Sequence, residues 1–385
     1  MIIRNEIFSC ENFPQLRKQP WQNAVFYDIE TTGLGWRSSH IYLIGALFFK
    51  DGNWILRQWF LDRPFAEKEM LADFSGFLQQ LQPSSSFLTD YNGDTFDLPY
   101  LRSKFRFYDL PLPDLLLPDT ERTVPFAEHV DLLRKLRPLK TRLGLPSLRL
   151  QDVEAFLRTQ RTDASSGKEL IEVYYQYLQS GEDTLLEQLF LHNHDDVAGL
   201  PPVVSLLAFS EFWEGNYRLS DIKVLQDHAQ FRLLRPDPFP VSFSLSRDLS
   251  TYGGTILVEE RHFSCTLQFD GTEAILTVPV IEGERKLFFK DYKNYYYLPG
   301  EDQAIHKSVG MFTDPAFRKQ AKASSCYQRV SGSFVPFPSD PEIAGMHSFF
   351  REYKDSTVWI RTDDLLSCDP ESLHECIQCI LDGVF

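Results

Sequence analysis

The feature that most constrains the fold of this chain is the apolar run at residues 24–31, AVFYDIET, which ends in acidic and hydroxyl side chains. A short apolar run bounded by turn residues is typical of a buried β-strand. Alternate residues of a strand point to one face, so Asp28 and Glu30 are expected to project together. Adjacent carboxylates repel each other unless a cation lies between them, and Mg²⁺ and Mn²⁺ prefer oxygen ligands. The pattern therefore predicts a metal site or, as the simpler alternative, surface acids at an exposed strand end.

Further strands and helices are predicted on either side of this strand. Two strand candidates, 41–49 and 54–61, are separated by a turn at 50–53, and shorter ones lie at 86–91 and 128–131. Apolar residues at helical spacing predict helices at 64–82, 96–105, 132–137, 167–180 and 183–200. This order predicts an α/β fold in which helices cover both faces of a mixed five-stranded sheet.

The pattern changes after about residue 205. Residues 229–298 alternate between apolar and polar side chains and contain hairpin turns, and residues 340–385 have helical spacing. A length of 385 residues is typical of two or three domains. We therefore expect one domain at 1–205, a linker at 206–225, and a β-rich α+β domain of unassigned role at 226–385.

The charge of the chain excludes one class of function. With 39 basic and 54 acidic residues the net charge is −15, so the chain is not expected to coat duplex DNA non-specifically. An excess of carboxylates is compatible with a metal site, because a bound ion supplies local positive charge. Six cysteines are too few for a disulfide scaffold, and neither a signal peptide nor a membrane-spanning run is apparent. We expect a cytoplasmic protein without membrane partners.

A second group of candidate residues lies in the segment 91–101, YNGDTFDLPYL, where a strand leads through a turn into a helix. Asp94 is expected to be the turn acid, and Asp97 to point inward because apolar residues flank it. Taken alone, an Asp near a helix start is also a plain stabiliser of the helix N-terminus.

A third group lies in the segment 191–197, LHNHDDV. The apolar stripe of this predicted helix runs through Leu189, His192, Asp196 and Leu200. A buried carboxylate needs a partner, and His192 lies one turn before Asp196. The simpler interpretation is a paired His and Asp at a helix surface.

Taken in order, these three motifs resemble one known architecture. D-x-E on the first strand, N-G-x-x-F-D after a later strand and H-x-x-x-D-V on a late helix make residues 20–205 similar to the RNase H-like superfamily of DEDD exonucleases. The N-G-x-x-F-D motif resembles most the one in the proofreading domains of family B DNA polymerases and in stand-alone bacterial RNase H-like proteins. The segment 129–133, HVDLL, also resembles one common in that bacterial group. The resemblance implies that two Mg²⁺ or Mn²⁺ ions are held by Asp28, Glu30, Asp97 and Asp196.

The chain departs from this resemblance at the position of the general base. Relatives of this type carry a Tyr four residues before the last Asp, where this chain has His192. A second class uses a His five residues before it, where this chain has Leu191. His192 and His194 therefore both stay open as the general base. The resemblance implies a two-metal 3′–5′ exonuclease acting on single-stranded DNA or RNA. The alternatives are a structure-specific endonuclease and a catalytically inactive nucleic-acid-binding module.

Candidate substrate contacts lie near these motifs. They are Thr31 and Asn92 at the strand ends, and Arg134, Lys140 and Arg142 in a basic cluster at 134–149. Cations in such a cluster can follow a phosphate backbone, although a solvated surface is an equally good interpretation. The sequence does not distinguish DNA from RNA, because that depends on contacts to the 2′ position of the sugar.

Two other patterns are interpreted as structural. Cys376-x-x-Cys379 resembles a zinc motif but lies on an apolar helix face, which favours buried thiols. Asp152 and Glu154 repeat the D-x-E spacing in a helical context, where residues i and i+2 diverge, so a second metal site is not expected there.

Overall fold

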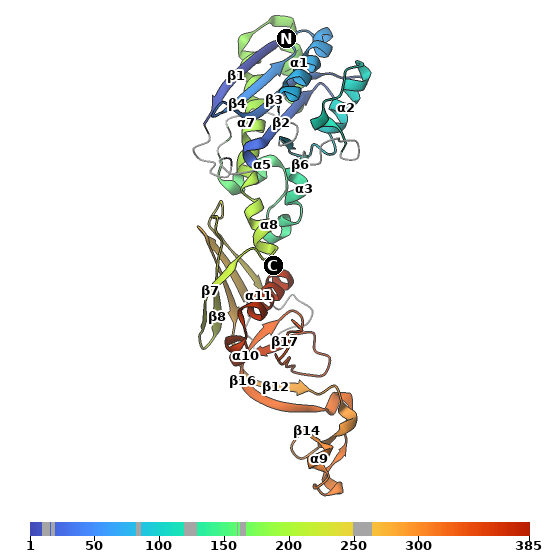
Figure 1. The fold of residues 1–385 in the computed structure, drawn as a ribbon, viewed down its shortest axis with the longest axis vertical. Coiled ribbons are helices and arrows are strands. Elements are labelled where there is room, and N and C mark those ends of the chain that lie inside the picture. The colour runs from blue at the N-terminus through green and yellow to red at the C-terminus, as the bar shows by residue number, and fades with distance from the viewer. Residues whose placement is uncertain are drawn as a thin grey trace. The chain divides into compact units, whose positions relative to one another are not determined.

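The computed structural model describes residues 1–9, 16, 20–81, 86–118, 129–159, 161, 167–248 and 264–385. The chain divides into two compact units, Met1–Leu207 and Ala208–Phe385. Figure 1 gives the course of the chain, and each unit is considered by itself. Within the described ranges, no helix has both the length and the apolar character needed to cross a membrane.

The first unit contains a six-stranded mixed sheet in the order β1-β4-β3-β2-β5-β6. Pairing is antiparallel from β1 through to β2, whereas β5 is parallel to β2 and β6 is parallel to β5. The strands are β1 (Ile2–Phe8), β2 (Ala24–Thr31), β3 (Ile41–Lys50), β4 (Asn53–Phe60), β5 (Phe87–Asp90) and β6 (Val130–Asp131). The helices are α1 (Glu67–Gln80), α2 (Asp97–Phe107), α3 (Leu132–Leu136), α4 (Leu139–Leu143), α5 (Leu150–Leu157), α6 (Gly167–Ser180) and α7 (Asp183–Val204).

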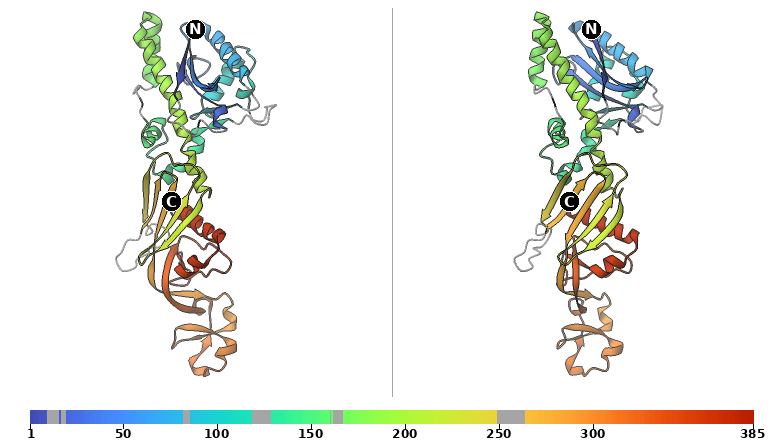
Figure 2. Two further views of the ribbon diagram at one scale, coloured as in Figure 1. Left: turned by 60° about the vertical axis from the view of Figure 1, so that its left-hand side comes forward. Right: turned by 90° about the vertical axis from the view of Figure 1, so that its left-hand side faces the viewer.

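Helices cover both faces of this sheet, as Figure 2 shows for α1 and the long helix α7. Successive residues of β4 alternate between the two helices, as the two-residue period of a strand requires. The Trp59 ring packs on Phe74 of α1 with ring centroids 5.3 Å apart, whereas Phe60 packs on Phe190 of α7 at 5.5 Å. The predicted mixed sheet with helices on both faces is confirmed.

The five predicted strands correspond to β2 through β6, and β1 adds a sixth. Glu128, the first residue of the last predicted strand, lies outside the described residues. Strand β1 pairs antiparallel with β4 at the edge of the sheet, from Ile2 opposite Phe60 to Phe8 opposite Trp54. Most of its side chains are at least partly exposed, so its sequence lacks the apolar run by which the buried strands were predicted.

The structure describes secondary structure within the predicted linker at 206–225. It contains α8 (Leu207–Trp213) and β7 (Arg218–Val224). Helix α8 is fixed by its aromatic residues, since Phe209 packs on Phe239 at a centroid distance of 5.0 Å and on Phe269 at 5.2 Å. An apolar segment that buries three aromatic side chains is part of a core, so it cannot serve as a solvated connection.

The second unit is β-rich, as predicted, with three antiparallel sheets in the orders β7-β8-β11-β10-β9, β12-β16-β17 and β14-β13-β15. Its remaining strands are β8 (His228–Leu234), β9 (Phe243–Asp248), β10 (Ser264–Asp270), β11 (Glu273–Pro279), β12 (Ile281–Phe288), β13 (Tyr295–Leu298), β14 (Gln303–His306), β15 (Lys319–Gln320), β16 (Tyr327–Phe337) and β17 (Val358–Arg361). Its helices after α8 are α9 (Lys307–Gly310), α10 (Thr362–Ser367) and α11 (Pro370–Val384).

The cysteines of α11 lie on a packed helix. Cys376 is buried beside Ile377 and Ile380, and burial raises the pKa of its thiol to about 12. Such a thiol stays protonated near neutral pH and is a poor zinc ligand. Among the residues that the structure describes, no cluster of metal-binding side chains includes a cysteine. The interpretation as a buried thiol agrees with the packing of Cys376, whereas Cys379 is only partly buried.

A buried ion pair joins α1 to α2 in the first unit. Lys104 Nζ lies 2.9 Å from Glu67 Oε2, and the two side chains are 4% and 1% exposed. The other Glu67 oxygen accepts the backbone N–H of Ile41 at 2.8 Å, which ties the pair to β3. The pair therefore links two helices to the strand next to β2.

We expect Lys104→Met to lower the free energy of unfolding by about 3 kcal/mol at pH 7, because it leaves the Glu67 carboxylate buried without its cation. The double variant Glu67→Gln/Lys104→Met removes both charges and is expected to recover part of this loss. Urea denaturation of the three proteins measures the difference. Equal midpoints for the wild type and Lys104→Met would contradict a stabilising role for the pair.

Candidate active site

Helix α7 approaches the sheet closely at Gly45 of β3, which lies opposite Asp28 of β2. A Cβ atom added at Gly45 would lie only 2.2 Å from Asn193 Oδ1 and 2.8 Å from Val197 Cγ2. A larger residue at this position would have to displace the side chains of Asn193 and Val197. The missing side chain therefore lets residues 192–196 of α7 reach the carboxylates at the end of β2.

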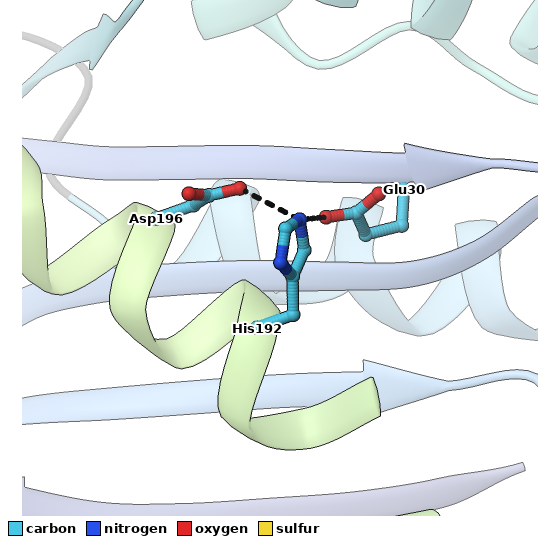
Figure 3. Close-up of side chains that lie close together, drawn as sticks. All are labelled: Glu30, His192 and Asp196. Atoms are coloured by element: carbon cyan, nitrogen blue, oxygen red, sulfur yellow. Dashed lines mark ion pairs between the residues drawn. The ribbon is translucent and has the colours of Figure 1, made fainter. Parts of the chain in front are cut away.

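Three predicted site residues converge here, as Figure 3 shows. His192 Nε2 lies 3.3 Å from Glu30 Oε1 and 3.2 Å from Asp196 Oδ2. One ligand atom from each of the three residues lies within 4.8 Å of the others. A single imidazole nitrogen thus faces two carboxylates, one from the sheet and one from the helix.

Asp28 is connected to the same helix by an amide. Asn193 Nδ2 donates to Asp28 Oδ2 at 3.1 Å, and Asn193 Oδ1 accepts from Gln58 Nε2 at 3.0 Å. Asn193 and Gln58 are both buried. This chain of hydrogen bonds from β4 through α7 to β2 orients the Asp28 carboxylate.

Asp97 is the first residue of α2 and is buried. The backbone N–H groups of Ile29 and of Asp97 itself hydrogen-bond to its carboxylate. Two other aspartates, Asp90 and Asp94, precede α2 in the chain and both contact His129. His129 Nε2 lies 2.6 Å from Asp90, and its Nδ1 lies 3.1 Å from Asp94. Asp94 is therefore a turn acid, paired with a neighbouring histidine, and Asp97 is the acid that faces inward.

Burial and mutual repulsion raise the pKa values of three carboxylates in this cluster. Burial, followed by the charges of Asp196 and Asp97, raises the pKa of Asp28 well above its ordinary value. The pKa of Glu30 is also raised well above its ordinary value, first by burial and then by the charge of Asp28. The pKa of Asp97 is raised in the same way, first by burial and then by the charge of Asp90. His192 opposes the shift at Asp28 and Glu30. A divalent cation bound among these carboxylates would relieve their mutual repulsion.

The residues fit Mg²⁺ or Mn²⁺. The converging atoms of Glu30 and Asp196 are carboxylate oxygens, which hard divalent cations prefer, and imidazole also binds Mn²⁺. Asp28 and Asp97 add two carboxylates whose charges are felt within the same cluster. The fit rests on these donor atoms and on their unfavourable mutual charge.

His194 lies apart from this cluster. Its Nδ1 is 3.2 Å from Asp195 Oδ1, and its Nε2 is 3.9 Å from Glu6 Oε1 of β1. Two residues along a helix correspond to more than half a turn, so His192 and His194 point in different directions. Of the two histidines that the sequence left open, His192 is the one beside Glu30 and Asp196.

The predicted substrate-binding residues have mixed surroundings. The Thr31 hydroxyl donates to the Gly33 carbonyl at 3.0 Å, and Asn92 Oδ1 accepts from the Thr95 hydroxyl at 2.8 Å. Arg134 pairs with Asp94 at 2.7 Å, whereas Lys140 is exposed and Arg142 half-buried on α4. Nothing in these contacts identifies a substrate, so these five residues stay predictions.

Four residues that contact the site were not predicted: Tyr42, Gln58, Arg161 and Asn193. Tyr42 donates to Glu30 Oε2 at 3.4 Å, and Arg161 Nη2 donates to Asp196 Oδ1 at 2.5 Å. Asn193 had a detectable signal, because it lies four residues before the apolar Val197 on the same helix face. The other three come from distant segments, which only the tertiary fold brings to the site.

Comparisons with known proteins give a family match within the N-terminal half of the chain and structural matches that extend beyond it. A family model described as the RNase H superfamily matches residues 25–208, and no curated protein matches the chain. Similar solved structures include Escherichia coli exonuclease I in complex with a dT13 oligonucleotide, at 13% identity and a TM-score of 0.33, covering 64% of this chain and 51% of that one. A product-bound exonuclease I is 11% identical with a TM-score of 0.32, covering 94% of this chain and 73% of that one. The chain spans about half the length of the first structures that it matches.

Proposed function

We propose that this chain, whose residues 25–208 match a family model described as the RNase H superfamily, is a divalent-metal-dependent nuclease that removes nucleotides from the 3′ ends of single-stranded DNA or RNA. The observation that carries the proposal is the convergence of Glu30, His192 and Asp196 within 4.8 Å, next to the mutually repelling Asp28 and Asp97. Paired, buried carboxylates around a hydrolytic site are the usual means of holding divalent metal ions.

In this proposal Asp28, Glu30, Asp97 and Asp196 hold two Mg²⁺ or Mn²⁺ ions. Bound metal supplies a water of lowered pKa and positive charge that stabilises the phosphate in the transition state. Asn193 keeps the Asp28 carboxylate oriented through its 3.1 Å hydrogen bond. Hydrolysis with this set of groups releases a nucleoside 5′-monophosphate.

His192 serves as the proton acceptor in this scheme. Its Nε2 faces both Glu30 and Asp196, so water held between these carboxylates lies within reach of the imidazole. Imidazole is the side chain best suited to transfer protons near neutral pH. The alternative is that His192 binds a metal ion itself, since its Nε2 is one of the three converging ligand atoms.

The two roles of His192 predict different outcomes for His192→Ala. As a proton acceptor, its loss is expected to lower the single-turnover rate about 100-fold and leave the Mn²⁺ concentration for half-maximal activity unchanged. A Mn²⁺ titration of single-turnover cleavage measures both quantities. A large rise in the Mn²⁺ requirement, with the rate restored at saturation, would instead make His192 a ligand.

A direct test of the proposal uses single-stranded DNA and RNA labelled at either the 5′ or the 3′ end, with Mn²⁺ or with a chelator. A Mn²⁺-dependent ladder that shortens the 5′-labelled strand from its 3′ end is the expected result. Internal cuts would favour a structure-specific endonuclease on the same fold. Intact strands that still bind the protein would favour the inactive nucleic-acid-binding module and overturn the proposal.

A further inference from the structure

Asp196 of α7 has a second partner besides His192. Its Oδ1 accepts a hydrogen bond from Arg161, and Arg161 in turn pairs with Glu154 of α5. We propose that Arg161, held by Glu154, is a positioning residue that fixes the orientation of the Asp196 carboxylate and thereby sets the metal affinity of the site. The inference rests on the proposed function, because it assumes that Asp196 is a metal ligand.

The contacts divide the two oxygens of Asp196 between different partners. Asp196 Oδ1 accepts a hydrogen bond from Arg161 Nη2 at 2.5 Å. Asp196 Oδ2 faces His192 Nε2 at 3.2 Å and belongs to the converging cluster with Glu30. With one oxygen held by the guanidinium, rotation of the carboxylate is restricted and the other oxygen stays directed at the cluster.

Arg161 is itself held from its other side. Its Nη1 lies 3.5 Å from Glu154 Oε2, and the side chains of Arg161 and Glu154 are only 13% and 6% exposed. Burial raises the pKa of Glu154, and the charge of Arg161 is the largest of the effects that lower it. The guanidinium thus lies between two carboxylates in a largely buried position, where screening by solvent is weak.

The position of Glu154 depends on a glycine of α7. A Cβ atom added at Gly199 would lie 2.2 Å from Glu154 Oε1. Gly199 is three residues after Asp196, so both lie on neighbouring positions of one helix face. Because Gly199 has no side chain, the Glu154 carboxylate of α5 can lie against α7 and pair with Arg161. Glu154, which the D-x-E spacing alone did not connect to chemistry, therefore contacts a partner of the site.

The geometry explains why arginine occupies this position. Two different terminal nitrogens of one planar group face Asp196 and Glu154. The ammonium of lysine is a single point charge and does not reproduce this fixed fork. Hydrogen-bond partners of metal ligands commonly change metal affinity by about 10- to 100-fold when they are removed.

The test measures binding of Mn²⁺ alone, by titration calorimetry, to full-length protein without nucleic acid. Arg161→Gln and Arg161→Lys are both expected to weaken Mn²⁺ binding by about 10- to 100-fold. Arg106→Gln is the matched control, because Arg106 is an exposed arginine in the last turn of α2. Its Mn²⁺ affinity is expected to equal that of the wild type.

A double variant separates positioning from simple charge balance. Glu154→Gln/Arg161→Gln removes both members of the buried pair, so its folding stability is expected to be closer to that of the wild type than that of Arg161→Gln. Its Mn²⁺ affinity is expected to stay low, because Asp196 still lacks its donor. Recovery of Mn²⁺ affinity together with stability would overturn the positioning role.

The remaining outcomes distinguish this inference from the proposed function. If the wild type binds no Mn²⁺, the proposed function fails. If the wild type binds Mn²⁺ and both Arg161 variants bind it equally well, only the positioning role fails. An unchanged Mn²⁺ affinity with a raised KM for an oligonucleotide would mean that Arg161 contacts the substrate, which also overturns the inference.

Discussion

Asp28→Asn is expected to lower the rate of hydrolysis by about 10³-fold and, at the same time, to raise the thermal stability of the metal-free protein at pH 8. The first effect follows from loss of a metal-binding carboxylate. A metal ion contributes several kcal/mol of charge stabilisation in the transition state, and about 4 kcal/mol corresponds to about 10³-fold in rate. Single-turnover cleavage with saturating Mn²⁺ measures the loss.

The second effect follows from the surroundings of Asp28. Its carboxylate is partly buried, and desolvation together with the charges of Asp196 and Asp97 makes the charged form unfavourable in the metal-free fold. Asparagine removes this charge, and its side-chain oxygen can still accept the hydrogen bond from Asn193 Nδ2. Thermal denaturation in the presence of a chelator is therefore expected to give a higher Tm for Asp28→Asn than for the wild type.

The control for this pair of measurements is Asp51→Asn in the exposed turn between β3 and β4. It removes one carboxylate from the surface, so neither the rate nor the Tm is expected to change. A variant Asp28→Asn that keeps more than a tenth of the wild-type rate would be incompatible with a role for Asp28 in metal binding. A lowered Tm in chelator would show that Asp28 stabilises the fold.

The parts of this fold that could be predicted from sequence are those whose signal is local. The apolar run at 24–31 and the helical spacing at 183–200 each bury one side of their own element, so patterning alone predicted β2 and α7. The resemblance then connected Asp28, Glu30 and Asp196, and the structure brings the helix that carries Asp196 to the strand that carries the other two.

The parts that could not be predicted depend on tertiary contacts. Arg161 contacts Asp196 across 35 residues, and Gln58 contacts Asn193 across 135 residues, so no local pattern reports either pair. Gly45 and Gly199 look like ordinary glycines in the sequence. Their importance lies in what approaches them, Asn193 in one case and Glu154 in the other. The aromatic residues of α8, within the predicted linker 206–225, pack on residues further along the chain such as Phe239 and Phe269, and no local pattern reports these contacts.

The metal-free protein is expected to lose stability as the pH rises from about 5 to 8, and Mn²⁺ is expected to restore it. Burial and mutual repulsion raise the pKa values of Asp28, Glu30 and Asp97 above their values in the unfolded chain. A carboxyl whose pKa is raised on folding stabilises the fold below its unfolded pKa. That stability is lost as the pH rises through the folded pKa, because the carboxyl loses its proton at a smaller free-energy cost in the unfolded chain than in the fold.

Mn²⁺ acts in the opposite direction because it binds the ionised carboxylates. At a free concentration about a thousandfold above its Kd, a ligand that binds only the folded state stabilises it by about 4 kcal/mol. For a domain of this size about 1 kcal/mol corresponds to about 2–4 °C, so the expected rise in Tm at pH 8 is about 8–16 °C. At pH 5 the carboxyls retain more protons, and the rise in Tm is expected to be much smaller.

His194 also makes the stability of the fold decrease as the pH rises, so its effect on Tm has to be separated from that of the carboxyls. The hydrogen bond to Asp195 raises the pKa of His194, so its stabilisation is also lost as the pH rises. The variant His194→Gln removes this contribution, whereas Glu30→Gln and Asp28→Asn remove carboxyls of the cluster. We expect the fall in Tm to persist in His194→Gln and to become smaller in the other two. A Tm of the metal-free protein that does not fall over this range, or a Mn²⁺ effect equal at pH 5 and pH 8, would mean that these carboxyls do not bind metal in their ionised form.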